Sequence, residues 1–129
     1  LASACRGQYM SRHPLPNSKL RRSIKDPTAR LQLGLSKTYA YHRETEAMMA
    51  SVLKDARDFP LMAPYHAHWS LAANILVAPW RLRGHRKRLL HAGIAHALAF
   101  ETWRDLTREQ GLTDKHAVDL MLCLTCDCA

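Results

Sequence analysis

The sequence predicts an all-α fold, a bundle of about five to six helices in one domain spanning residues 1–129. No segment combines β-branched residues, alternating hydrophobicity and hairpin turns, which strands require. Apolar residues instead recur at spacings of three and four, the period of an amphipathic helix. The length of 129 residues also suits one domain, because a chain of this size buries a core without disulfides or metals.

The first predicted helix is only the end of one. Residues 1–12 carry apolar side chains at helical spacing. The segment His13-Pro14-Leu15-Pro16 ends this pattern, because proline forces the residue before it out of the helical region. We interpret residues 1–16 as the tail of a helix.

Two further helices are predicted before residue 60. Asp26 followed by Pro27 offers an N-cap and a first helical residue, and helical spacing then continues to about Arg43. Thr45 can cap a separate helix, with Glu46 placed against its positive end.

The second half of the chain predicts three more helices. One extends from Pro60 to Pro79, and a basic connection follows at residues 81–88. The last two helices are expected at about Arg86–Gln110 and Thr113–Cys128, with Gly111 between them. Both are apolar nearly all round, so each must be covered on more than one side.

Charge and cysteine content indicate the setting of the protein. The formal net charge of +8 makes the surface attractive to anions. The cysteines, Cys5 and the cluster Cys123, Cys126 and Cys128, make a poor disulfide framework and indicate a reducing compartment. The uncharged stretch Leu61–Trp80 contains two histidines and two prolines, which disfavours a membrane span. We therefore expect a cytoplasmic protein without membrane contact.

Three segments carry a resemblance to a known family. Lys37–Asp55 (KTYAYHRETEAMMASVLKD), Leu90–Arg104 (LHAGIAHALAFETWR) and Gly111–Asp114 (GLTD) together resemble the C-terminal effector-binding domain of TetR-family transcriptional regulators. The resemblance implies a repressor that binds operator DNA through an N-terminal helix-turn-helix head, and that head is absent from this sequence. Residues 1–16 would then be the end of the helix that joins the head to the effector domain. The resemblance also implies a small, mostly apolar effector molecule.

The same resemblance implies a homodimer, in which the last two helices of each copy form a four-helix bundle. The alternative is that these two apolar helices form the interior of a monomer. A sedimentation mass of 14.7 kDa would decide for the monomer. The predicted interface residues are Leu90, Gly93, Ile94, Ala97, Ala117, Val118, Met121, Leu122 and Leu124.

A ligand site is predicted between the third, fourth and fifth helices, where aromatic and polar side chains would converge. The predicted ligand-binding residues are Tyr39, His42, Met49, Tyr65, His68, Trp69, Leu76, His96, Phe100 and Trp103. The alternative for each of them is an ordinary place in the core. An enclosed cavity of about 300 Å³ or more between these helices would support the ligand site, whereas a solid interior would contradict a sensor and favour a helical interaction module.

No metal or other cofactor is expected. Two histidine ligands on one helix need a spacing of four, whereas His66 and His68 are two apart and His91 and His96 are five apart.

The cysteine cluster Cys123, Cys126 and Cys128 has zinc-like spacing but no second cysteine pair, so it is interpreted as structural, with a redox-sensitive thiol or a metal ligand as alternatives. No nucleophile with a base and no glycine-rich phosphate loop is present, so the protein is not expected to be an enzyme.

Two other functions remain open. The first is a stand-alone helical module for dimerisation or protein interaction, without a small-molecule ligand. The second is nucleic-acid binding through the basic run at residues 81–88, although this run is interpreted first as a solvated connection.

Overall fold

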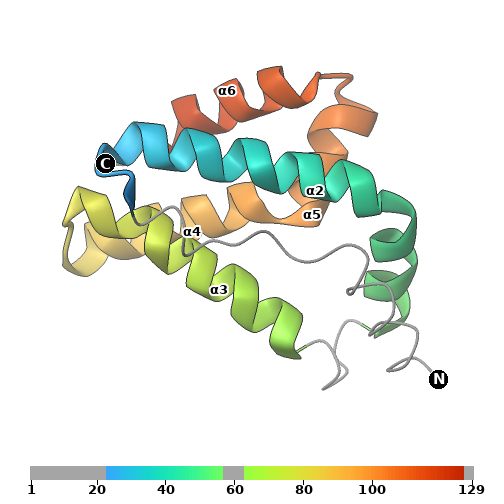
Figure 1. The fold of residues 1–129 in the computed structure, drawn as a ribbon, viewed down its shortest axis with the longest axis horizontal. Coiled ribbons are helices and arrows are strands. Elements are labelled where there is room, and N and C mark those ends of the chain that lie inside the picture. The colour runs from blue at the N-terminus through green and yellow to red at the C-terminus, as the bar shows by residue number, and fades with distance from the viewer. Residues whose placement is uncertain (1–22, 57–62, 127–129) are drawn as a thin grey trace.

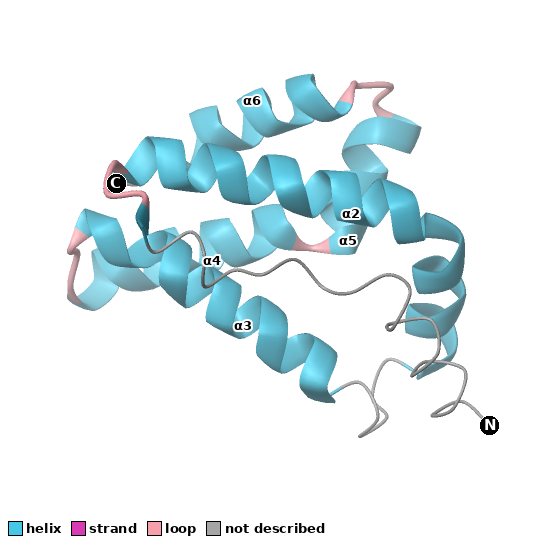
Figure 2. Ribbon diagram, in the orientation of Figure 1, coloured by secondary structure: helices cyan, strands magenta, loops and turns pink. Residues whose placement is uncertain are grey.

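The computed structural model of the protein describes residues 23–56 and 63–126, and these residues form an all-α bundle (Figures 1 and 2). Its helices are α2 (Pro27–Ala56), α3 (Ala63–Val77), α4 (Gly84–Leu98), α5 (Phe100–Arg104) and α6 (Asp114–Cys126), with short helical segments η3 (Ala78–Trp80) and η4 (Asp105–Glu109). The predicted fold class is confirmed, and no strand occurs in these two ranges. The predicted helix tail at residues 1–16 lies outside them.

Helix α2 is the longest element and the centre of the bundle. It packs against α6, α3, α4 and α5. Figure 1 shows α2 running across the molecule, with α6 on one side and α3 and α4 on the other. The core therefore lies between α2 and every other long helix.

The start of α2 is the predicted one, but its length is not. The Asp26 carboxylate accepts the backbone N–H of Ala29 at 2.8 Å, and Pro27 is the first helical residue. Thr45 does not begin a new helix. Its buried hydroxyl donates to the carbonyl of Tyr41 at 2.8 Å, four residues earlier, so α2 continues without interruption to Ala56.

At Gly34, the backbone of α2 lies close to a side chain of α3. A Cβ atom added at Gly34 would lie 2.9 Å from a terminal methyl carbon of the buried Leu76. The glycine that weakens α2 as an isolated helix is therefore what lets Leu76 pack against the helix backbone.

The segment after α3 differs from the expected loop and long helix. Only residues 81–83 are a connection, because Gly84 already begins α4. The expected helix Arg86–Gln110 is interrupted at Ala99, whose backbone is extended with ψ of 140°. Beyond the interruption, α5 and η4 lead to Gly111, which has the expected positive φ of 73°.

Thr113 caps α6 as predicted, because its hydroxyl oxygen accepts the backbone N–H of His116 at 3.1 Å.

Next to this cap, a network centred on Trp103 joins α2 and α6. The fully buried indole donates its N–H to an Asp114 carboxylate oxygen at 3.0 Å. Arg43 donates two hydrogen bonds to the same carboxylate, at 3.0 and 2.8 Å, and these bonds lower the pKa of Asp114.

Arg108 extends the Trp103 network to the middle of α2. It donates two hydrogen bonds to the Glu46 carboxylate, at 2.9 and 2.5 Å. The guanidinium groups of Arg43 and Arg108 lie 5.4 and 5.7 Å from the Trp103 ring centroid, within the range of a cation–π contact. The Trp103 indole thus makes cation–π contacts with two arginines, and each arginine also forms an ion pair with a carboxylate.

The predicted dimer residues lie mostly inside one chain. Six of them are buried against the other helices of the same copy and have no surface to offer a second copy, which corrects the predicted interface: Leu90, Ile94, Ala97, Ala117, Val118 and Met121. Gly93 and Leu122 are half-buried, and Leu124 is 55% exposed. The apolar pattern was real, but α2, α4 and α6 use it to pack on each other.

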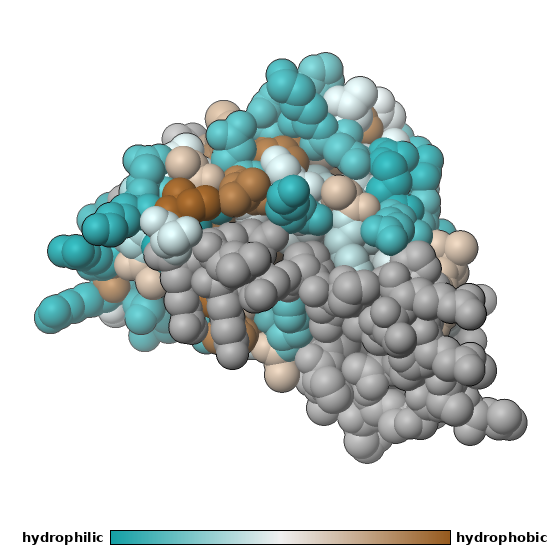
Figure 3. Space-filling view, in the orientation of Figure 1, coloured by the Kyte–Doolittle hydropathy of each residue, from teal (hydrophilic) through white to brown (hydrophobic). Residues whose placement is uncertain are grey.

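Across residues 23–56 and 63–126, none of the helices combines the length and the apolar character needed to cross a lipid bilayer. Where residues are drawn in colour, the face in Figure 3 is mostly hydrophilic, with apolar areas of limited extent between the hydrophilic ones.

The Trp103 network predicts the effect of a conservative substitution. Trp103→Phe should lower the free energy of unfolding by about 2 kcal/mol, because it removes a hydrogen bond to a charged acceptor and weakens two cation–π contacts. Urea unfolding followed by circular dichroism measures this change. The control Trp80→Phe, at a half-buried tryptophan outside the network, should cost less than about 1 kcal/mol. Equal losses in the two variants would contradict the role of the network.

Candidate functional site

The candidate site is the interruption between α4 and α5. In a continuous helix the carbonyls of Ala97 and Leu98 would accept N–H groups four residues later. Here the Tyr39 hydroxyl donates to the carbonyl of Ala97 at 2.7 Å, and the His42 Nε2 lies 2.8 Å from the carbonyl of Leu98. Two side chains of α2 therefore satisfy the carbonyls that the interruption leaves open.

His42 occupies the centre of an aromatic cluster. Its ring centroid lies 5.4 Å from that of Trp69, 5.5 Å from that of Phe100 in an edge-on arrangement, and 6.1 Å from that of Trp103. Tyr39 and Tyr41 complete the cluster at 6.3 and 6.2 Å. These contacts connect α2 to α3 and to α5, the helix that follows the interruption.

The protonation state of His42 follows from this environment. Burial lowers its pKa to about 4, although the hydrogen bond to Leu98 and the charges of Glu101 and Asp114 act in the opposite direction. The ring is therefore neutral at pH 7, and Nε2 must carry the proton, since a carbonyl can only accept. The Nδ1 lone pair is buried and has no hydrogen-bond partner among the described residues. Burial likewise raises the pKa of Tyr39, so its hydroxyl remains a donor.

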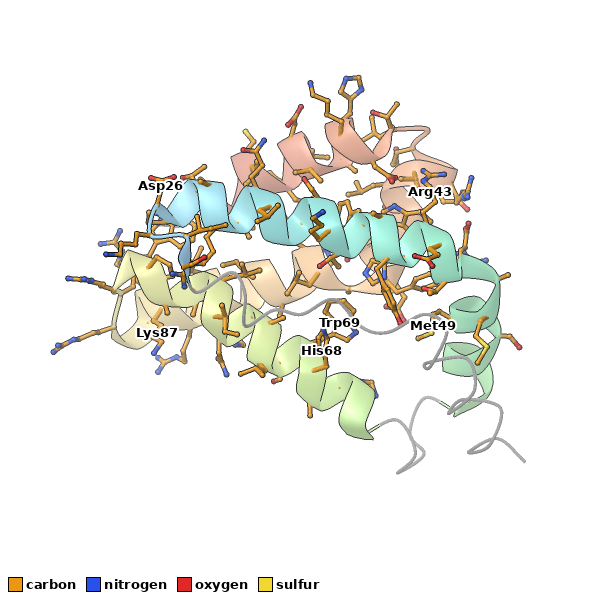
Figure 4. All side chains as sticks on the ribbon, viewed as in Figure 1. Asp26, Arg43, Met49, His68, Trp69 and Lys87 are labelled. Carbon is orange, nitrogen blue, oxygen red and sulfur yellow. The ribbon has the colours of Figure 1, made fainter. Side chains whose placement is uncertain are left out.

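A half-open pocket of about 150 Å³ lies at the interruption. Its lining comes from the first part of α3, the end of α4 and the start of α5: His66, Trp69, Ala95, Leu98, Ala99, Phe100 and Glu101. Most of the lining is apolar, and Glu101 and His66 are exposed. Figure 4 shows Trp69 projecting from α3 toward the other helices, next to His68. His42 lies behind this pocket, in contact with Trp69 and Phe100.

The predicted ligand residues divide into three groups. Trp69 and Phe100 line the pocket. The residues that pack in the core instead are Tyr39, His42, Met49, Leu76 and Trp103.

Three predicted ligand residues remain. His68 is half-buried with its ring edge-on to Trp69 at 4.7 Å, and His96 is exposed, 3.5 Å from the Thr102 hydroxyl. The Tyr65 side chain lies outside the described part of the structure.

Sequence reasoning missed most of the pocket. The residues that it did not select are His66, Ala95, Leu98, Ala99 and Glu101. No glycine or proline lies near Ala99 in the sequence, so no local sequence signal indicated a helix interruption or a pocket there. The one available indication was the pair of polar aromatic side chains, Tyr39 and His42, on an otherwise apolar face of α2.

A second hollow of about 320 Å³ opens between the start of α2 and the end of α3. Its lining consists of Arg30, Leu71, Asn74, Ile75 and Ala78. The Arg30 guanidinium donates to the carbonyls of Ile24 and Ile75, at 2.6 and 2.9 Å, so it fastens the two helix ends together. This hollow contains none of the predicted ligand residues.

The described residues contain no group of three or more histidine, cysteine or acidic side chains placed to hold a metal ion. His91 instead joins α4 to α3 through a 3.0 Å contact with the Asn74 side-chain oxygen. Cys123 is an exposed free thiol and Cys126 a half-buried one, whereas Cys128 lies outside the described residues.

No family model matches the chain, and comparisons with curated proteins and with solved structures give no significant match.

The pKa of His42 predicts how stability depends on pH. The unfolded chain binds a proton at His42 near its ordinary pKa of 6.5, and the folded chain binds it only near 4. The stability that neutral His42 provides is therefore present above pH 6.5 and lost as the pH falls toward 4, by up to about 3 kcal/mol. His42→Gln keeps an N–H donor for Leu98 but does not titrate in this range. Unfolding free energies measured from pH 7.5 to 4 should show a steeper decline in the parent chain than in this variant, and parallel curves would contradict the assignment.

Proposed function

We propose that this chain is the ligand-sensing domain of a transcriptional regulator of the TetR type and that the pocket at Ala99 holds the ligand. The observation that supports this proposal is the pocket itself, a mostly apolar opening at a helix interruption that buried polar side chains maintain. Its volume is about half of the expected minimum of 300 Å³. Cavities of about 150 Å³ hold molecules the size of benzene. The proposed effector is accordingly a small, mostly apolar molecule with about one ring.

The position of the pocket suggests how binding would be transmitted. A ligand changes a conformational equilibrium only if it binds one state better than the other. Leu98 and Phe100 line the pocket on the two sides of the interruption, and both contact His42 of α2. A ligand that alters the angle between α4 and α5 would therefore move α2. In the proposed cytoplasmic repressor, such a movement would reach an operator-binding head outside this sequence.

Benzene is the first probe of the pocket. We expect saturable chemical-shift changes in ¹H–¹⁵N spectra at the backbone amides of residues 98–101 and at the Trp69 indole N–H, because these groups surround the pocket. Ala99→Leu fills the pocket and should abolish the changes. Ala92→Leu adds the same side chain on the exposed face of α4 and should preserve them. Absence of a saturable response in the parent chain would contradict the proposal, as would equal responses in the two variants.

We also propose that the domain acts as a homodimer, through the outer faces of α4 and α6. Large apolar side chains are exposed there: Leu89 is 49% exposed, Leu120 38% and Leu124 55%. Exposed apolar surface of this kind favours a protein partner. Of the interface residues predicted from the sequence, Gly93, Leu122 and Leu124 have surface left for contact with a second copy.

Sedimentation equilibrium at micromolar concentration tests the dimer. We expect twice the chain mass of 14.7 kDa, and the double substitution Leu120→Glu with Leu124→Glu should return the mass to that of one chain. The control, Leu33→Glu with Leu71→Glu, introduces the same charges at exposed leucines of α2 and α3 and should leave the dimer intact. A parent chain that sediments as a monomer would remove this part of the proposal.

The exposed leucines equally favour a second candidate function, a helical module for dimerisation or protein interaction without a small-molecule ligand. The two functions differ in the pocket. A dimer with a pocket that does not respond to benzene would favour the module, whereas a benzene response that Ala99→Leu removes would favour the sensor.

A further inference from the structure

The charges of this protein are unevenly distributed along the sequence, and cations gather at one end of the described bundle. No aspartate or glutamate occurs between Asp58 and Glu101 in the sequence. The cations of that stretch all lie in the connection after η3 and in the first turns of α4, and we call this set the basic end: Arg81, Arg83, Arg86, Lys87 and Arg88. All five are exposed. Figure 4 shows Lys87 at the opposite end of the molecule from Arg43.

The basic end differs in its ion pairing from the charged residues around Trp103. At the other end, Arg43 and Arg108 are held by Asp114 and Glu46. Within residues 23–56 and 63–126, by contrast, Arg81, Arg83, Lys87 and Arg88 form no ion pair. Asp26, just before the start of α2, uses its carboxylate to cap that helix. These four cations are therefore available to an external anion.

Two further features of the basic end are unfavourable for the stability of the fold. The residues before and inside the first turn of α4 are basic, and that turn contains no acidic residue and no side-chain cap, so the cations face the positive end of the helix dipole. Arg81 also adopts a positive φ of 53°, a conformation that glycine would adopt with less strain. A bound polyanion would offset the repulsion among these cations.

We propose that the basic end binds the phosphate backbone of duplex nucleic acid, independently of base sequence. Four of its five cations are arginines, whose planar guanidinium groups match phosphate oxygens in pairs. A membrane surface fits less well, because surface-binding helices carry a broad apolar face beside the basic one. In residues 81–88 the single apolar residue, Leu82, packs against the core, and one exposed leucine, Leu89, follows. This contact would be additional to any operator contact by a helix-turn-helix head.

Fluorescence anisotropy with a labelled 20-base-pair duplex of mixed sequence, on the whole 129-residue chain, tests the proposal. Each phosphate that a cation neutralises contributes about 0.9 to the slope of log affinity against log salt concentration. The triple variant Arg83→Gln, Lys87→Gln and Arg88→Gln should lower affinity at 50 mM salt at least about tenfold and reduce the slope by about two to three.

The matched control removes three exposed cations elsewhere, Lys37→Gln, Arg104→Gln and Lys115→Gln, and has the same net charge. It should keep affinity within about threefold of the parent chain, because only cations near the phosphates release counterions. Circular dichroism confirms that each variant is folded. If the triple variant unfolds, the single variants Lys87→Gln and Arg88→Gln should each reduce the slope by about one.

Three results would overturn the proposal. The first is equal loss of affinity in the two triple variants, which would indicate a response to net charge alone. The second is no binding of the duplex at 50 mM salt. The third is binding of phosphatidylserine vesicles that the basic-end variant abolishes, with no binding of the duplex, which would assign the surface to a membrane.

Discussion

The arrangement of this protein depends on two hydrogen bonds from α2 to the end of α4. Tyr39 and His42 bind the carbonyls of Ala97 and Leu98, which an uninterrupted helix would use itself. Without these partners the buried carbonyls would be unsatisfied, and closing the helix would be favoured. The interruption lets α5 leave the axis of α4, and the pocket lies where the two helices separate. The extended backbone of Ala99 is thus stabilised by two side chains that lie more than fifty residues away in the sequence.

The same two side chains connect the pocket to the rest of the core. His42 contacts Trp103 across 6.1 Å, and Trp103 in turn donates to Asp114 at the start of α6. The buried aromatic cluster and the charged network around it therefore form one continuous structure, with α2 as its common support. A change in the position of Phe100 or Trp69 would act directly on His42, because its ring contacts both and its Nδ1 has no hydrogen-bond partner among the described residues.

Features that depend on neighbouring residues, such as helix caps, could be predicted from the sequence. Features that depend on packing between distant segments could not. The caps at Asp26 and Thr113 and the positive φ of Gly111 are decided within a few residues, and each was predicted. Thr45 also has the chemistry of a cap, yet its hydroxyl satisfies a carbonyl of its own helix. The apolar faces of α4 and α6 revealed burial but not the burying partner, so residues such as Ile94 and Val118 were assigned to a second copy. The pocket was missed because the interruption at Ala99 is imposed from α2, and of its lining only Trp69 and Phe100 were expected.

The uneven charge distribution has a physical consequence for motion in solution. The cluster of cations at one end, and the ion pairs of Arg43 and Arg108 at the other, give the described part of the molecule a permanent electric dipole moment directed along the bundle. In the field of a large anionic body such a molecule turns before it touches, and it arrives with the first turn of α4 leading. The pocket at Ala99 lies at the opposite end of α4 from that leading edge. Orientation by the field would therefore leave the entrance to the pocket in contact with solvent.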